Sequence, residues 1–117
     1  MSYRKYDPKI SSARGIWKKS YGEMLFEDFY ELSQQNCFYC GDPPNNTYNI
    51  ADKRYSKYAK EEGNFIYSGL DRKDNTIKKH TKENCVACCS VCNIMKRNRT
   101  MEEFIEWANR VYKIFNK

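Results

Sequence analysis

The chain has 117 residues, which suits one domain, and its 40% hydrophobic content with a mean hydropathy of -0.94 implies a small core. No apolar run is long enough to span a bilayer, and the N-terminal MSYRKYDPKI lacks the apolar stretch of a secretory signal, so we expect a cytoplasmic protein without a membrane partner. The net charge of +6 and the ten tyrosines suit a nucleic-acid partner, because cations attract phosphate and aromatic faces stack on bases. A solvated basic surface is the alternative.

Two helices are predicted in the first third of the chain. After a polar start, Ser11 or Ser12 is expected to cap a short helix over about residues 12–21. A second helix is expected over residues 24–32, where apolar side chains recur at helical spacing. These side chains are Leu25, Phe26, Phe29, Tyr30 and Leu32.

The middle of the chain is less regular. Residues 42–64 are rich in Asp, Pro, Asn, Lys and Gly, and they predict a long surface loop with a helical turn near residues 55–60. The next elements are expected to be a strand at residues 65–71, a polar turn at 72–84, a short return strand at 86–87 and a helix from about Asn93 to Asn98.

The last helix has the strongest sequence signal. Thr100 is a good cap, and Glu103 three residues later completes a capping box. The apolar positions that follow predict a buried stripe. The stripe comprises Phe104, Ala108, Val111, Tyr112 and Phe115, with Trp107 and Ile114 at its edge.

Two Cys-x-x-Cys pairs, about fifty residues apart, predict a structural zinc site. Cys37 and Cys40 form the first pair, and Gly41 behind them suits the tight turn of a zinc knuckle. Cys89 and Cys92 are favoured as the second pair, because the residues after them look helical. Cys85 and Cys88 have the same spacing and are the alternative pair; otherwise they are small buried hydrophobic residues. Disulfides are the remaining alternative, disfavoured without a secretory signal.

If the two pairs share one metal ion, the chain between them is pinned at both ends. Asp71 and Asn93 then come within reach of each other. The segments that carry these residues resemble the zinc-containing HNH endonucleases, many of which are carried by phages and mobile elements. The resemblance rests on Cys-Phe-Tyr-Cys-Gly, Ser-Gly-Leu-Asp-Arg-Lys-Asp-Asn, Thr-Lys-Glu-Asn and Cys-Cys-Ser-Val-Cys-Asn-Ile-Met-Lys, within residues 36–98.

The resemblance implies an α+β fold with a small ββα-metal core over residues 36–98 and flanking helices at about 10–35 and 100–116, all in one domain. It implies that Asp71 and Asn93 bind a catalytic Mg²⁺ or Mn²⁺ ion, that Asn84 braces the loop between the strands, and that the four cysteines bind structural Zn²⁺. It also implies DNA cleavage, as a nick or a double-strand break.

One position departs from the family pattern. Most HNH enzymes have a His after the metal-binding Asp, and this chain has Arg72, which cannot act as a general base. Arg72 could instead clamp the scissile phosphate. His80, the one histidine, has the right pKa range for the base, but a solvated loop histidine is the alternative, as is a hydroxide.

Several basic residues are candidates for contacting phosphate, and the alternative is that they form a solvated face. They are Lys73, Lys96, Arg97 and Arg99, with Tyr55 as a candidate for stacking on bases. The sequence therefore predicts a metal-dependent DNA endonuclease, with a homodimer or a partner protein supplying specificity. A zinc-stabilised DNA-binding module that has lost cleavage is the main alternative, and an RNA-directed nuclease is a weaker one.

Overall fold

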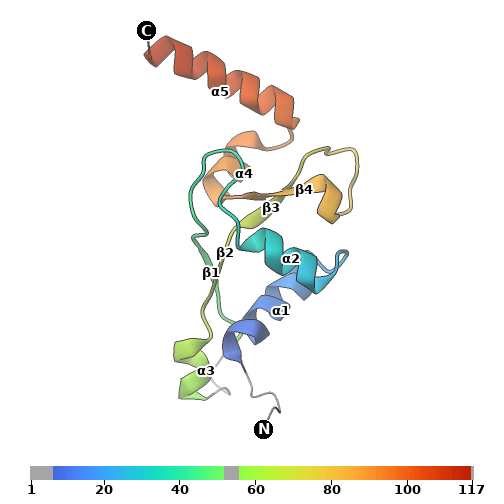
Figure 1. The fold of residues 1–117 in the computed structure, drawn as a ribbon, viewed down its shortest axis with the longest axis vertical. Helices are drawn as coiled ribbons and strands as arrows, with labels where there is room; N and C mark the ends of the chain where they lie inside the picture. The colour runs from blue at the N-terminus through green and yellow to red at the C-terminus, as the bar shows by residue number, and fades with distance from the viewer. Residues whose placement is uncertain (1–6, 52–55, 117) are drawn as a thin grey trace.

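The computed structural model describes residues 7–51 and 56–116. In chain order its elements are α1 (Pro8–Ser20), α2 (Phe26–Ser33), β1 (Asn46–Tyr48), α3 (Lys57–Glu62), β2 (Phe65–Tyr67), β3 (Gly69–Arg72), the 3-10 turn η1 (Lys82–Asn84), β4 (Cys85–Cys88), α4 (Ser90–Lys96) and α5 (Met101–Phe115). The α+β class is confirmed. The molecule is elongated, 59 × 29 × 28 Å, with α3 and the start of α1 at one end and α5 at the other (Figure 1).

Two antiparallel hairpins lie between these ends. β1 pairs with β2, with Thr47 opposite Ile66, and β3 pairs with β4, with Asp71 opposite Val86. The single strand expected at residues 65–71 is divided at Ser68. The backbone N–H of Ser68 donates to the carbonyl of Ser33 (2.7 Å), so at this residue the chain bonds to the end of α2 rather than to a strand.

The helix α1 begins earlier than expected. The prediction that Ser11 or Ser12 caps it is wrong, because the Asp7 carboxylate accepts from the backbone N–H of Lys9 at 3.0 Å. Pro8 follows as the first helical residue, where its fixed φ and missing N–H cost nothing. Ser12 is instead fully buried, and its hydroxyl accepts from the backbone N–H of Ile50 at 3.1 Å.

The main apolar core is built where α1 and α2 pack on β2 and β3. Phe29 of α2 is fully buried at its centre and stacks on Tyr21, with ring centroids 5.2 Å apart. Two members of the expected α2 stripe, Leu25 and Tyr30, are exposed. The buried cluster consists of Ala13, Ile16, Met24, Phe26, Phe29, Leu32, Phe65, Leu70 and Cys85.

The segment expected to be a long loop contains two short elements, β1 and α3. Ser56 caps α3 through its hydroxyl, which accepts from the N–H of Ala59 at 3.1 Å. Asn49 ties β1 to α3, since its side-chain amide donates to the carbonyl of Lys60 at 3.0 Å. The helical turn predicted near residues 55–60 corresponds to α3, whereas β1 was not predicted, because a three-residue strand leaves little periodic signal.

The C-terminal helix has the predicted start and a different environment. The Thr100–Glu103 capping box is confirmed, with both reciprocal hydrogen bonds present. The predicted burial of its apolar stripe is wrong, because Phe104 is the buried residue among residues 101–115. Phe104 packs edge-on against Tyr39, with ring centroids 5.2 Å apart. Beyond this contact α5 projects away from the hairpins (Figure 1). Across residues 7–51 and 56–116, the helices lack the length and apolar character that crossing a bilayer requires.

A candidate zinc centre beside a polar cleft

The sulfur atoms of Cys37, Cys40, Cys89 and Cys92 lie within 4.8 Å of one another. The sulfurs of Cys40 and Cys89 are 3.7 Å apart. A tetrahedral zinc ion with Zn–S bonds of about 2.3 Å requires its sulfur ligands to be about 3.8 Å apart. Four thiols at this spacing therefore fit a zinc ion, which is the geometry that the two Cys-x-x-Cys pairs predict.

Local backbone geometry shapes both halves of this centre. Gly41 has a φ of 82°, which glycine adopts without strain, and its N–H donates to the carbonyl of Cys37 at 2.9 Å. In the second half, Cys89 caps α4, and its sulfur accepts from the N–H of Cys92 at 3.4 Å. The N–H of Phe38 donates to the carbonyl of Ala87 at 2.8 Å, which joins the first knuckle to β4.

The pKa values of the clustered thiols are shifted in opposite directions. Burial opposes ionisation of Cys37, but hydrogen bonds from the backbone N–H groups of Cys89, Cys40 and Tyr39 outweigh it and lower the Cys37 pKa to about 6. Burial raises the pKa of Cys92, and contacts with the neighbouring thiols raise it further. Four close thiolates repel one another until a cation neutralises them, so this donor set suits a Zn²⁺ ion that would be bound here.

The remaining two cysteines lie outside the four-sulfur cluster. Cys85 is buried in the main core, where burial raises its pKa to about 11. Cys88 is 2% exposed and belongs to the smaller buried cluster around the zinc centre. The placement of the four clustered sulfurs matches the favoured Cys89/Cys92 pairing rather than the Cys85/Cys88 alternative.

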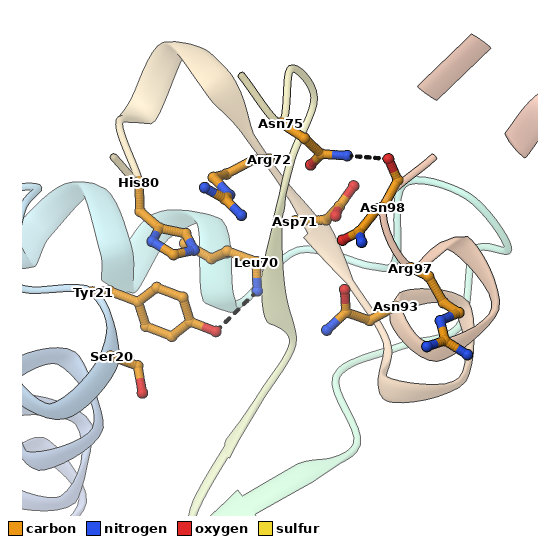
Figure 2. A pocket seen from close by; sticks show the side chains of 10 residues that line it. All are labelled: Ser20, Tyr21, Leu70, Asp71, Arg72, Asn75, His80, Asn93, Arg97 and Asn98. Carbon is orange, nitrogen blue, oxygen red and sulfur yellow. Dashed lines mark hydrogen bonds between the residues drawn. The ribbon is translucent and has the colours of Figure 1, made fainter. Parts of the chain in front are cut away.

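A polar cleft of about 440 Å³ is lined in part by Asn93, the residue that follows Cys92 in the chain (Figure 2). Its walls come from the end of α1, the strand β3, the loop that follows β3, and the end of α4. Its lining residues are Ser20, Tyr21, Leu70, Asp71, Arg72, Asn75, His80, Asn93, Arg97 and Asn98. Four of the five residues predicted to be catalytic line the cleft: Asp71, Arg72, His80 and Asn93.

Asp71 is the buried acid of the cleft, with 6% of its surface exposed. The hydroxyl of Tyr39 donates to its Oδ2 at 2.7 Å, and the ammonium of Lys96 lies 3.1 Å from the same oxygen. Lys96 is fully buried, so the prediction that it contacts DNA is wrong. It serves instead as the counter-ion of Asp71, because a buried carboxylate is costly without one.

Asn93 and Arg72 reach the cleft from different elements. Asn93 is exposed on α4, and Figure 2 shows its amide pointing to the same space as the Asp71 carboxylate. The guanidinium of Arg72 donates from Nη1 to the carbonyl of Lys78 at 2.9 Å. This bond holds the Arg72 side chain against the loop while it lines the cleft.

His80 is half-buried in the wall of the cleft. Its backbone N–H donates to Oε1 of Glu23 at 3.0 Å, and its ring Nδ1 lies 3.8 Å from the same oxygen. The ring packs edge-on against Tyr21, with centroids 5.2 Å apart. Burial, and then the positive charge of Arg72, lower the pKa of His80 below its ordinary 6.5. The imidazole is therefore neutral at pH 7.

Asn84 lies behind the cleft rather than in it. Its side-chain oxygen accepts from the N–H of Asp74 at 3.0 Å, and its amide donates to the carbonyl of Asp74 at 3.1 Å. Its own carbonyl accepts from the N–H of Lys73 at 2.7 Å. These bonds close the loop that follows Arg72 and contains His80.

The other basic candidates are spread around the rim. Arg97 is exposed and lines the cleft, with a positive φ of 54° that ends α4. Arg99 is exposed, and its guanidinium donates to the carbonyl of Met95 at 3.0 Å. Lys73 is half-buried beside the strand end. Tyr55 lies outside the described residues.

Three side chains that shape the site, Tyr39, Glu23 and Tyr21, were not predicted from the sequence, and a fourth, Lys96, was predicted in another role. Tyr39 and Lys96 hold Asp71, and Glu23 and Tyr21 hold His80. Tyr39 offered a signal, since it lies inside the first Cys-x-x-Cys pair, which a shared metal ion would hold close to the second pair. Glu23 and Tyr21 offered none, because the contacts join segments nearly sixty residues apart.

Comparisons with known proteins add little to this description. No family model and no solved structure matches the chain. Among curated proteins, the uncharacterized protein R423 of Acanthamoeba polyphaga mimivirus is 32% identical over 79 residues. The match covers 68% of this chain and 11% of the viral protein, so the chain spans a small part of its relative's length.

Proposed function

We propose that the chain is a metal-dependent endonuclease of the HNH type that hydrolyses phosphodiester bonds in DNA. One observation carries the proposal: an acid on a hairpin strand (Asp71) and an amide on the following helix (Asn93) line one cleft with Arg72 and His80. The four-cysteine cluster, whose Cys92 directly precedes Asn93 in the chain, and the net charge of +6 support it.

Asp71 and Asn93 would hold the divalent ion through oxygen, the ligand type that Mg²⁺ and Mn²⁺ prefer. Such an ion would neutralise charge on the phosphate and help the leaving oxygen depart. The Asp71 carboxylate fits this role in part, because Oδ1 has the longer contact with Lys96 (3.4 Å) and Oδ2 is engaged by Tyr39 and Lys96. Since Lys96 already balances the charge of Asp71, we expect weak affinity for the ion.

His80 is the base that this cleft offers in place of the usual histidine after the strand. Its neutral ring would accept a proton from the attacking water, and Glu23 beside Nδ1 would orient the ring and stabilise the imidazolium that forms. Arg72 would bind the phosphate oxygens in the same cleft. The proposed roles of the cleft residues are thus compatible with their contacts.

The proposal is tested by incubating the protein with supercoiled plasmid and Mg²⁺ or Mn²⁺. Asn93→Ala should reduce nicking by about 100-fold or more, because the amide ligand is lost from an exposed position that does not support the fold. Ile94→Ala, the next residue and 66% exposed, is the matched control and should nick normally. Equal nicking by both variants contradicts the assignment.

The role of His80 has its own readout. The acid limb of the wild-type pH–rate profile should fall below pH 6.5, because burial lowers the His80 pKa and activity is lost only when the ring protonates. His80→Gln should lose that limb together with most of its activity at pH 7. An unchanged limb in His80→Gln assigns the titration to another group.

The second candidate function is a zinc-stabilised module that binds DNA without cutting it. Two observations favour it: Arg72 follows Asp71 where a base is usual, and Lys96 already neutralises Asp71. Retardation of the plasmid in a gel without nicking, in wild type and Asn93→Ala alike, would support this candidate over the nuclease.

A further inference from the structure

The helix α5 exposes an apolar stripe that no other part of residues 7–51 and 56–116 covers. Phe104, in its first turn, is 7% exposed, whereas Val111 is 39%, Ile114 is 59% and Phe115 is 81% exposed. Trp107, Arg110, Val111, Ile114 and Phe115 line a shallow groove on this helix. Figure 1 shows most of α5 standing clear of the hairpins. Apolar side chains gathered in this way mark a surface that associates with another one.

The spacing of the stripe fits a helix as its partner. Phe104, Trp107, Val111 and Ile114 are separated by three, four and three residues. This alternation repeats every 3.5 residues, which is the seam that one helix presents to another in a coiled coil. The 15 residues of α5 give a seam of about two heptads.

The charges of α5 favour a second copy of α5 as the partner helix. Its first half carries Glu102, Glu103 and Glu106, and its second half carries Arg110 and Lys113. Two copies placed antiparallel set the acidic half of each against the basic half of the other, whereas a parallel pair opposes like charges. A single surface patch that complements itself in this way is the requirement for a two-fold symmetric dimer.

We propose that α5 is a dimerisation helix, which pairs antiparallel with the α5 of a second copy of this chain through the Trp107–Val111–Ile114 seam. The proposal does not depend on the nuclease assignment, because the helix makes no part of the cleft. The dimer buries the stripe that the main core leaves exposed. It also places two zinc centres and two clefts in one particle.

Sedimentation equilibrium of the full chain tests the proposal. At about 100 µM we expect a particle of twice the 14.0 kDa chain mass. Val111→Glu should return the mass to that of one chain, because it places a charge in the apolar seam. Asn109→Glu, on the opposite face of the same helix, is the matched control and should remain dimeric. A single-chain mass for wild type, or a dimeric Val111→Glu, overturns the proposal.

Salt dependence separates the two orientations. Opposed acidic and basic halves attract, so the dissociation constant of an antiparallel dimer should rise as the salt is increased from about 50 to about 500 mM. A parallel dimer should tighten instead, because salt screens its like-charge repulsion. Tightening would overturn the antiparallel arrangement. Circular dichroism of Val111→Glu should match wild type below its unfolding transition, which shows that the exposed substitution leaves the fold intact.

Discussion

The apolar core and the four-cysteine region, which form the two ends of the molecule on either side of the cleft, are each stabilised by different forces. At one end, nine buried apolar residues form the main core, where α1 and α2 pack on β2 and β3. At the other end, the smaller buried cluster comprises four cysteines and Phe104, and three of those cysteines belong to the candidate zinc centre. The first end folds by removing apolar surface from water, whereas the second has little such surface, so we expect it to need a metal ion for its stability. The cleft lies between them, so its geometry depends on both.

Removing the metal should have the largest effect. Cys92→Ser deletes one of the four thiolate ligands, and structural zinc contributes on the order of 10 kcal/mol to folding. We expect the zinc content, measured by elemental analysis, to fall from one ion per chain to near zero, and the second end to unfold. Cys88→Ala, a buried thiol outside the ligand set, should keep its zinc and lose about 1 kcal/mol.

The apolar end should respond differently. Phe29→Ala empties the centre of the main core and should lower the free energy of unfolding by about 3–5 kcal/mol in a denaturant titration. Its zinc content should be unchanged while it is folded. The neighbouring Tyr30→Ala should cost about 1 kcal/mol, because Tyr30 is already 37% exposed. Zinc loss in Phe29→Ala would show that the two ends are one cooperative unit.

The ion pair between Asp71 and Lys96 in the cleft can be tested by mutating each residue. Lys96→Met leaves a buried carboxylate without its counter-ion and should cost about 3 kcal/mol in unfolding free energy. Adding Asp71→Asn should recover part of that loss, since the uncompensated charge is gone. Additive losses in this double-mutant cycle would contradict the pairing. Lys57→Met, at an exposed position, is the control and should have little effect.

The smallest expected effect is at the start of α5. Thr100→Ala removes the hydroxyl that accepts from the N–H of Glu103 and should cost about 1 kcal/mol. Amide exchange in the first turn of α5 should accelerate, while exchange in α1 and α2 stays the same. Thr100→Ser keeps the hydroxyl and should behave as wild type. Faster exchange throughout the molecule would contradict a local role.

Sequence reasoning was most successful where chemistry depends on short spacings. The Cys-x-x-Cys pairs, the turn at Gly41 and the Thr100–Glu103 box each involve residues a few positions apart, and the structure has all three. The α+β class and the strand at β4 were also predicted correctly.

Two of the failures have a common physical cause, because burial and ion pairing depend on residues that are distant in the sequence. Periodicity showed that α5 has an apolar face, but burial depends on what lies opposite, and no element of the described chain covers Val111 or Phe115. Lys96 was placed in a basic surface cluster because charge alone does not reveal a partner 25 residues away. The early start of α1 was missed because Asp7 competed with two serines as a cap, and Pro8 favours the aspartate.

The contact between Asp71 and Lys96 has a consequence for the shape of the cleft when no other cation is present. A buried carboxylate without a counter-ion is costly, and it ordinarily takes up a proton or draws in water. Here the ammonium group acts as a resident placeholder, so the cleft can keep its shape while empty. The folded scaffold therefore needs no further cation to keep Asp71 buried in its place.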